Sequence, residues 1–313
     1  MADAPADTPF WVLDGALGTL VEARGFDVNN PLWGSACLVL DDGPGAVAQI
    51  HREYVEAGAD LIIANTHNAS QQRCADYGAR WGRLGRRARE FVRRSAAPDR
   101  ALLELVNRTA VEAARNAARP ATRVAACLMS PDRAYAERAT LDAGQIRDGL
   151  VHQARLLDGL ELEFVIFEMI STDADVEGVA KTLPELKSPR AVGLTCGADG
   201  RTHGGVDPVA AARRLVDAGA SAVFVQCTHH DHVQGPLRRL VAALDPDHVT
   251  VGAYANDGRV WRDGAWRGER IGPEAYAALA ARWVDAGARI VGSCCGTDPE
   301  HTRALARLRD AGG

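Results

Sequence analysis

The sequence predicts an α/β fold, a closed (β/α)8 TIM barrel in which eight parallel strands alternate with helices. Eight short runs are apolar throughout rather than alternating, as expected of parallel strands buried on both faces. Each run is followed by a stretch that can form a helix, and eight such units favour a closed barrel over an open sheet. No linker or low-complexity segment divides the 313 residues. We therefore expect a single domain over residues 1–313, with its core at about 10–311.

The predicted strands follow one another in a regular order along the chain. Small-residue turns containing Gly58, Gly219 and Gly287 precede the second, sixth and eighth runs, and Asp158-Gly159 precedes the fourth. Glycine suits these turns because the chain at a helix C-terminus often takes a left-handed conformation. The predicted strands are residues 10–15, 60–65, 123–129, 163–169, 191–196, 222–227, 249–255 and 289–295.

The helical connections are less uniform than the strands. The longest connection, roughly residues 66–122, follows the second strand and is expected to carry extra helices. The last helix is expected from Pro299 to Asp310.

Composition and charge exclude several classes of protein. The net charge is −5, and no basic face or run indicates a nucleic-acid or membrane partner. The polar N-terminus has no apolar targeting segment, and no stretch approaches the ~18 apolar residues that span a bilayer. Seven cysteines, an odd number in a chain of this size, indicate thiols or metal ligands rather than disulfides. We expect a cytoplasmic protein, and the sequence indicates no oligomeric state.

The residues that end the predicted strands should share one pocket, because barrel active sites lie at the C-terminal ends of the strands. In chain order these residues are Asp14, Gly15, Asn65, Thr66, Ser130, Glu168, Cys196, Cys227, Tyr254, Asn256, Cys294 and Cys295.

Three of these residues form a candidate metal site. Cys227 ends the sixth strand, and Cys294 and Cys295 end the eighth. Thiolates are soft ligands that favour zinc, and three protein ligands leave a fourth tetrahedral position open for chemistry. Adjacent cysteines in a regular strand point to opposite faces, so the chain must turn here, and Gly292 and Gly296 permit it. Each of the other cysteines is interpreted as a core residue: Cys37, Cys74, Cys127 and Cys196.

At these residues the sequence resembles the homocysteine S-methyltransferase family. The resemblance runs in order from about residue 10 to 310 and is most specific at its two ends. The matching segments are Asp14-Gly15-Ala16-Leu17-Gly18-Thr19, Pro31-Leu32-Trp33, Asn65-Thr66, Glu168, Cys227, Tyr254-Ala255-Asn256-Asp257-Gly258 and Gly292-Ser293-Cys294-Cys295-Gly296-Thr297.

The resemblance implies a zinc-dependent transferase that methylates homocysteine to methionine. It places Zn²⁺ on Cys227, Cys294 and Cys295, which act in catalysis through the metal. Asp14 and Glu168 would hold the amino-acid end of the thiol substrate, with Glu168 facing its ammonium group. Zinc removes the proton from a thiol, which otherwise has a pKa near ~8.5, so the acceptor becomes a thiolate nucleophile.

The methyl donor implied by the resemblance is an onium compound: S-methylmethionine, S-adenosylmethionine or a betaine. The Leu32-Trp33 neighbourhood is similar to the members that use S-methylmethionine. Aromatic faces hold cationic methyl groups well, and Trp33 and Tyr254 are the candidates here. His67 stands where the family often has an aromatic, and Met169 stands where betaine-using members have Tyr, which disfavours a betaine. We therefore favour S-methylmethionine or S-adenosylmethionine. The remaining residues expected to bind substrate are Gly15, Asn65, Thr66 and Asn256.

Departures from the family pattern leave alternatives open. The segment Thr228-His229-His230-Asp231-His232 follows Cys227 and is either a solvated loop or a source of a histidine ligand that displaces a cysteine or closes the fourth position. The acceptor is homocysteine or another small thiol or selenol, and a catalytically silent zinc- or thiol-binding barrel is a further alternative. A lysine-dependent aldolase is disfavoured because Lys181 and Lys187 lie outside the predicted strands. A metal hydrolase is disfavoured because its usual histidines and aspartates do not end the strands.

Overall fold

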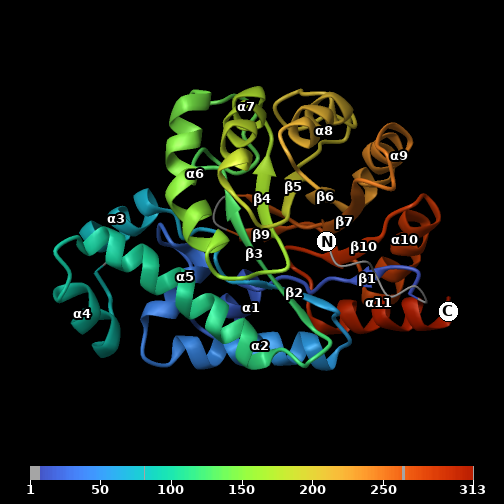
Figure 1. Ribbon diagram of the computed structural model, residues 1–313. Helices are drawn as coiled ribbons and strands as arrows, with labels where there is room; N and C mark the ends of the chain where they lie inside the picture. The colour runs from blue at the N-terminus through green and yellow to red at the C-terminus, as the bar shows by residue number, and fades with distance from the viewer. Residues whose placement is uncertain (1–7, 81, 263–264, 313) are drawn as a thin grey trace.

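The computed structural model describes residues 8–80, 82–262 and 265–312, and its centre is a sheet of eight parallel strands (Figure 1). The strands follow the order β1-β10-β7-β6-β5-β4-β3-β2 around the sheet, so chain neighbours lie side by side. Their bounds are β1 Trp11–Val12, β2 Leu61–Ala64, β3 Arg123–Met129, β4 Val165–Ile170, β5 Arg190–Leu194, β6 Ala222–His229, β7 Thr250–Asn256 and β10 Ile290–Ser293. Each strand overlaps one of the predicted runs, with bounds that differ most at β1.

The two ends of this sheet meet and close the barrel. Leu13 pairs with Leu61 in a parallel bridge just beyond β1. The Asp60 amide donates to the Val12 carbonyl at 2.8 Å, and the Asp14 amide donates to the Leu61 carbonyl at 2.9 Å. The predicted (β/α)8 TIM barrel is therefore confirmed.

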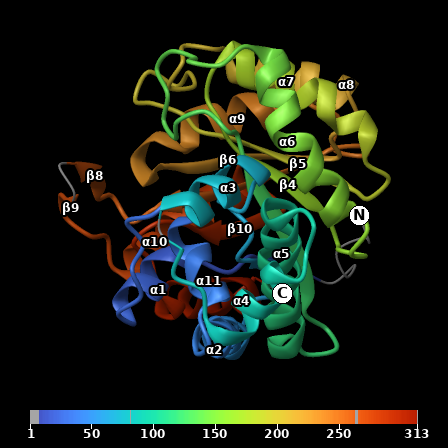
Figure 2. The same ribbon diagram turned by 90° about the vertical axis from the view of Figure 1, so that its left-hand side faces the viewer.

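Helices surround the strands on all sides (Figure 2). The connection after β2 carries three helices, as expected for the long insertion: α3 Gln71–Arg80, α4 Arg86–Arg93 and α5 Pro98–Ala117. The other helices are α1 Gly18–Ala23, α2 Gly43–Glu56, α6 Ala143–Asp158, α7 Asp173–Thr182, α8 Pro208–Asp217, α9 Gln234–Ala243, α10 Pro273–Asp285 and α11 Pro299–Ala311. Short 3₁₀ helices occupy η1 Trp33–Val39, η2 Leu183–Glu185 and η3 His230–His232.

A small antiparallel hairpin after β7 was not expected from the sequence. Its strands are β8 Val260–Arg262 and β9 Ala265–Arg267, and it projects from the side of the barrel (Figure 2). Each strand has only three residues, which is shorter than the apolar runs that identify the barrel strands.

The core has two layers that explain why the strands are apolar on both faces. Trp11 and Leu13 point into the barrel with Phe164, Ile166 and Phe224. The alternate residue of the first strand, Val12, belongs to the larger cluster between strands and helices. A parallel strand between these layers has no solvated face, so its sequence shows no alternation. The filled interior leaves the ends of the barrel as the place for a site.

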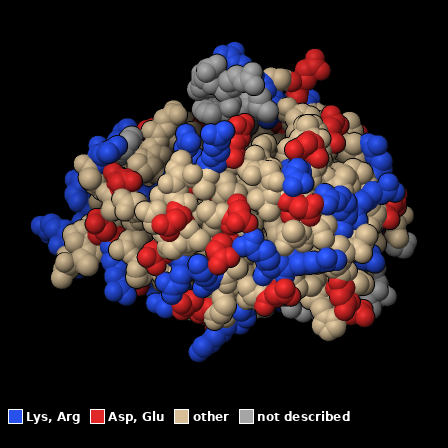
Figure 3. Space-filling model, turned by 90° about the horizontal axis from the view of Figure 1, so that it is seen from above, with Lys and Arg blue, Asp and Glu red and all other residues tan. Residues whose placement is uncertain are grey.

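Figure 3 shows the molecule from above, relative to Figure 1. Acidic and basic side chains are interspersed over this face, so it does not carry charge of a single sign. Within the described residues, no helix has the length and apolar character that a membrane span requires.

Candidate active site

A cavity of about 100 Å³ lies where the C-terminal ends of the strands converge. A larger cavity, of about 380 Å³, lies outside the barrel beside α2, α4 and α5, and its described lining residues include neither cysteine nor histidine. The smaller cavity is lined by the following described residues: Asp14, Gly15, Ala16, Leu17, Gly18, Thr19, Trp33, Ile63, Ala64, Asn65, His67, Cys127, Glu168, Gln226, Cys227, Tyr254, Ser293, Cys294 and Cys295.

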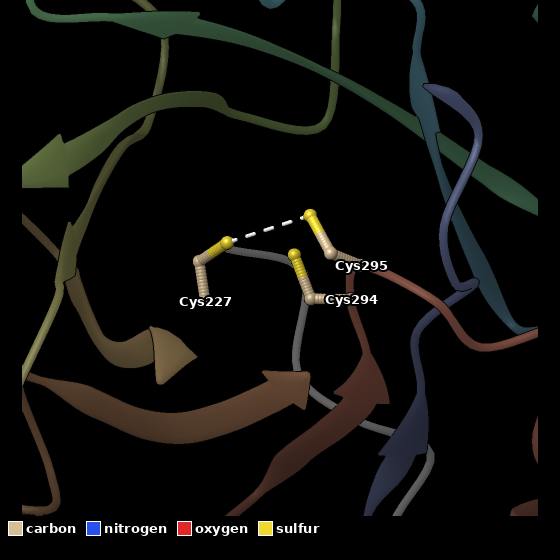
Figure 4. Close-up of side chains that lie close together, drawn as sticks. All are labelled: Cys227, Cys294 and Cys295. Carbon is tan, nitrogen blue, oxygen red and sulfur yellow. Dashed lines mark hydrogen bonds between the residues drawn. The ribbon is translucent and has the colours of Figure 1, made fainter. Parts of the chain in front are cut away.

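The three predicted thiols meet in this cavity. The Cys227 and Cys295 sulfurs are 3.7 Å apart, and the three sulfurs all lie within 4.8 Å of one another. Figure 4 shows them pointing toward one another, Cys227 from the end of β6 and the doublet from the end of β10. Cys227 has a left-handed backbone (φ +49°), and the pairing of β6 with β7 shifts register at this point. This irregularity turns its side chain toward the doublet.

Adjacent cysteines face the same space because the chain turns after β10. The Cys294 amide donates to the Ala255 carbonyl at 2.7 Å, and the Cys295 carbonyl accepts from the Asp257 amide at 3.0 Å. Gly296 follows with φ +82°, and a Cβ there would lie 2.3 Å from the Asp257 carboxylate. Only glycine fits this turn, in agreement with the sequence expectation.

The thiols fit a tetrahedral soft metal. With metal–sulfur bonds of about 2.3 Å, two ligands of a tetrahedral zinc lie about 3.8 Å apart. The 3.7 Å between Cys227 and Cys295 matches this spacing. Without a cation, hydrogen bonds from Cys294 and Cys295 hold the pKa of the Cys227 thiol well below its ordinary value. The thiolate they surround raises the pKa of both partners. A divalent cation would relieve this repulsion and let all three ionise.

Tyr135 and Asn256 surround the Cys227 sulfur. The Tyr135 hydroxyl lies 2.9 Å from it, and burial followed by the Cys227 charge raises the pKa of this phenol. The phenol therefore stays protonated beside the sulfur. The Asn256 amide nitrogen donates to the Cys227 carbonyl at 3.0 Å and to the Tyr135 oxygen at 3.2 Å. Asn256 Oδ1 also lies 3.3 Å from the Cys227 sulfur, so Asn256 holds Cys227 although it does not line the cavity.

Glu168 lines the same cavity and is held from two sides. Its Oε1 accepts from the Tyr254 hydroxyl at 2.7 Å, and its Oε2 lies 2.6 Å from His67 Nδ1. Burial and the Glu168 charge raise the pKa of Tyr254, so the phenol keeps its proton. The next residue, Met169, has φ +62°, where the pairing of β4 with β5 shifts register. The strained backbone at Met169 therefore lies directly beside the residue whose carboxylate is ordered in the cavity.

Two residues from the first part of the sequence, Asp14 and Trp33, also line the cavity. The Asp14 carboxylate accepts from the Ile63 amide at 2.9 Å, and burial raises its pKa. Trp33 has φ +48° and lies so close to Gly18 that a Cβ there would be 2.1 Å from its ring. Asn65 donates to the Gly34 carbonyl at 2.9 Å, which fixes the chain beside Trp33 against β2.

Other residues expected at the pocket lie behind it. Thr66 is fully buried, and its hydroxyl donates to the Cys127 carbonyl at 2.6 Å. Ser130 donates to Asp175, and Cys196 belongs to the core between strands and helices. Cys127, interpreted from the sequence as a core residue, does line the cavity.

Sequence reasoning missed the contacts of Tyr135 and His67. Tyr135 lies in the connection after β3, and nothing in its sequence context distinguishes it. His67 directly follows the strand-end pair Asn65-Thr66 and departs from the aromatic usual in the family, and this departure is the feature that could have revealed it.

The histidine loop lies beside the cavity, not in it. His229 and His230 stack at 4.4 Å between ring centroids, and His232 lies 4.9 Å from His229. None of these three lines the cavity. Among the described residues, the histidine that shares the cavity with the three sulfurs is His67, and the loop histidines do not enter it.

Fold and site together define a barrel protein with a thiol-rich candidate metal centre at its mouth. The family model for homocysteine S-methyltransferase matches residues 11–308, and the chain belongs to this family of methyltransferase enzymes.

Curated relatives and solved structures agree with this membership. Homocysteine S-methyltransferase 1 of Zea mays is 27% identical over 95% of this chain and 93% of its own length. Homocysteine S-methyltransferase YbgG of Bacillus subtilis is 26% identical over 95% of this chain and 94% of its own. The oxidized form of the homocysteine methyltransferase MmuM of Escherichia coli superposes with a TM-score of 0.76, covering 96% of both chains at 20% identity. This structural likeness supports the fold.

Proposed function

We propose that this protein transfers a methyl group from an onium donor to the thiol of homocysteine, giving methionine. The observation that carries the proposal is that three thiols converge in a cavity that also holds two buried carboxylates, Asp14 and Glu168. Its curated relatives are named for this reaction, and its family model covers nearly the whole chain.

We propose Zn²⁺ as the metal, held by Cys227, Cys294 and Cys295. The sulfur spacing and the all-thiolate donor set support zinc over harder cations. A solved MmuM structure is described as a metallated form. Bound there, zinc would supply Lewis acidity that keeps the acceptor sulfur deprotonated at neutral pH.

The chain's own residues bind and orient the two reactants. Glu168, fixed by Tyr254 and His67, would accept hydrogen bonds from the acceptor's ammonium, with Asp14 beside it. The acceptor thiol loses its proton to water before the transfer. Its sulfur lone pair then forms the bond to the methyl carbon as the donor's bond to that carbon breaks, and the onium centre leaves as a neutral molecule. No proton is transferred in that step, so positioning supplies much of the acceleration.

The donor we favour is a sulfonium compound, S-methylmethionine or S-adenosylmethionine. Trp33 and Tyr254 both line the cavity and supply aromatic surface for a cationic methyl group. Another small thiol or selenol as acceptor, or a silent zinc- or thiol-binding barrel, is the alternative. Two buried, hydrogen-bonded carboxyl groups favour a protein that binds an amino-acid substrate over one that only stores metal.

We also propose that residues 1–313 form one domain and that the protein works in the cytoplasm. One sheet contains all the barrel strands, and all seven cysteines are free thiols, as is usual in a reducing compartment.

The test combines metal analysis with an activity matrix on the same purified sample. We expect about one zinc per chain and methyl transfer to homocysteine from at least one sulfonium donor. Cys294→Ser and Cys295→Ser should each lose metal and lower kcat/KM by on the order of 100-fold or more. Thiol labelling should also rise in the variants, because a bound metal protects its ligands.

Cys74→Ser is the matched control, since Cys74 is buried on α3 and does not line the cavity. It should keep both metal and activity. Zinc-replete protein that transfers no methyl group to homocysteine from any donor would favour another acceptor or the silent barrel.

A further inference from the structure

The cavity is unusual in its balance of charged groups. Its lining includes the carboxyl groups of Asp14 and Glu168, and no lysine or arginine of the described part of the chain lines it. Among the described lining residues, His67 is the only side chain that can carry a positive charge near neutral pH.

An amino-acid acceptor brings both an ammonium and a carboxylate into this space. Glu168 supplies a partner for the ammonium, but a buried carboxylate without a partner of its own is costly. The acceptor's carboxylate therefore needs a donor close to Glu168, because the two groups of the substrate share one carbon.

His67 is placed where that donor is needed. Its Nδ1 lies 2.6 Å from Glu168 Oε2, and its side chain is 21% exposed. Its ring meets Trp33 edge-on at 6.0 Å between centroids. The other ring nitrogen, Nε2, has no hydrogen-bond partner in the part of the chain that the structure describes. Glu168 has hydrogen-bond contacts with Tyr254, His67 and Cys127, and a carboxylate has about four acceptor positions, so it retains capacity for an ammonium.

We propose that His67 is a specificity-determining residue, which binds the α-carboxylate of the acceptor through Nε2 while Glu168 binds its ammonium. The proposal rests on the proposed function. Glu168 and His67 thus place an acidic and a basic side chain next to each other. The ammonium of the substrate would lie against Glu168, and its carboxylate would lie against His67. The cavity thereby selects thiols that carry an intact amino-acid group over simple thiols.

The test compares three acceptors that differ in one group each. They are homocysteine, 3-aminopropane-1-thiol, which lacks the carboxylate, and 4-sulfanylbutanoic acid, which lacks the ammonium. The wild-type enzyme should prefer homocysteine to the aminothiol by about 10- to 100-fold in kcat/KM, as expected for a charge-assisted hydrogen bond. His67→Gln, whose amide can still donate to Glu168, should remove most of that preference by raising KM for homocysteine. His67→Phe, with the aromatic common in the family, should do the same.

Controls separate this role from a structural one. His152→Gln, on the exposed face of α6, should leave the preference unchanged. Glu168→Gln should instead remove the preference over 4-sulfanylbutanoic acid. An equal loss with homocysteine and the aminothiol in His67→Gln, or a raised KM for the donor alone, would overturn the proposal.

Metal analysis of the same samples covers the remaining outcome. His67, Cys127 and Glu168 have ligand atoms within 4.8 Å of one another. A second zinc per chain that His67→Gln removes would assign these residues to a metal and overturn the proposal. A wild-type enzyme inactive with homocysteine would instead contradict the proposed function itself.

Discussion

His51 lies on the buried face of α2 without any polar partner. Its side chain is completely buried, and neither ring nitrogen has a hydrogen bond within the described residues. Burial lowers the pKa of this imidazole from 6.5 to about 3. The ring is therefore neutral in the folded protein, and protonation favours the unfolded chain.

We predict that His51 makes the fold sensitive to mild acid. Because its folded pKa lies below its unfolded one, its contribution is complete above about pH 6.5 and is lost as pH falls toward 3. Near pH 5 the loss approaches ~1.4 kcal/mol per pH unit. His51→Leu, which cannot titrate, should lower this slope in urea unfolding measured at pH 7.5, 6 and 5.

The exposed His152→Leu on α6 is the control for His51 and should unfold like the wild type at each pH. An unchanged pH slope in His51→Leu would show that other groups determine the acid response.

At the residue scale, the sequence predicted the groups that end strands and missed those that reach in from loops. Cys227 and the doublet could be placed because parallel strands end at one edge. The position of Tyr135 depends on how the connection after β3 folds back, and no local pattern encodes it. The left-handed backbone at Cys227 and Met169 could not be predicted from the sequence either. Tertiary contacts hold non-glycine residues in this conformation, and no local pattern encodes those contacts.

At the element scale, α6 shows how a barrel helix is started. Asp142 accepts hydrogen bonds from the Gly144 and Gln145 amides at 2.8 and 2.9 Å. The Gln145 side chain accepts from the Asp142 amide at 2.9 Å, which completes a capping box. These contacts satisfy amides that the first helical turn would otherwise leave without partners.

We predict that Asp142→Ala lowers the free energy of unfolding by about 1 kcal/mol, the usual cost of losing an N-cap. Methyl transfer should be unchanged, because the cap lies outside the cavity. Chemical denaturation with parallel activity assays measures both. Asp148→Ala, an exposed acidic position in the same helix, should change stability by less than about half as much; equal losses would contradict a capping role.

Element prediction succeeded where burial determines the pattern. All eight apolar runs are barrel strands, although β1 retains regular pairing over only Trp11 and Val12. The hairpin of β8 and β9 was missed because two strands of three residues lack the length that gives a recognisable period. The extra helices after β2 were expected as a group, but not their separate bounds.

At the scale of the whole molecule, hydrogen bonds and an ion pair link the first strand to the last helix where the barrel closes. Asp60, which precedes β2, accepts from the Val12 amide at 2.8 Å. Arg309 on α11 donates to the same carboxylate at 2.6 and 2.7 Å, and to the Gly58 carbonyl at 3.2 Å. One carboxylate thus links the first strand, the second strand and the last helix. The site depends on this closure, because Asp14 and the cysteine doublet come from opposite ends of the chain.

We predict that Arg309→Met destabilises the barrel by about 1–2 kcal/mol, discounted for partial exposure of a pair whose side chains are 17% and 33% accessible. Methionine keeps the apolar stem packed, so the loss reports the polar contacts. Arg307→Met lies on the same helix, where its ion pair with Glu274 is 56% and 78% exposed, and should cost no more than about 0.5 kcal/mol. Urea unfolding of both variants at the same zinc content makes the comparison, because bound metal adds equally to the stability of each. Equal stabilities of the two variants would mean that strand pairing alone closes the barrel.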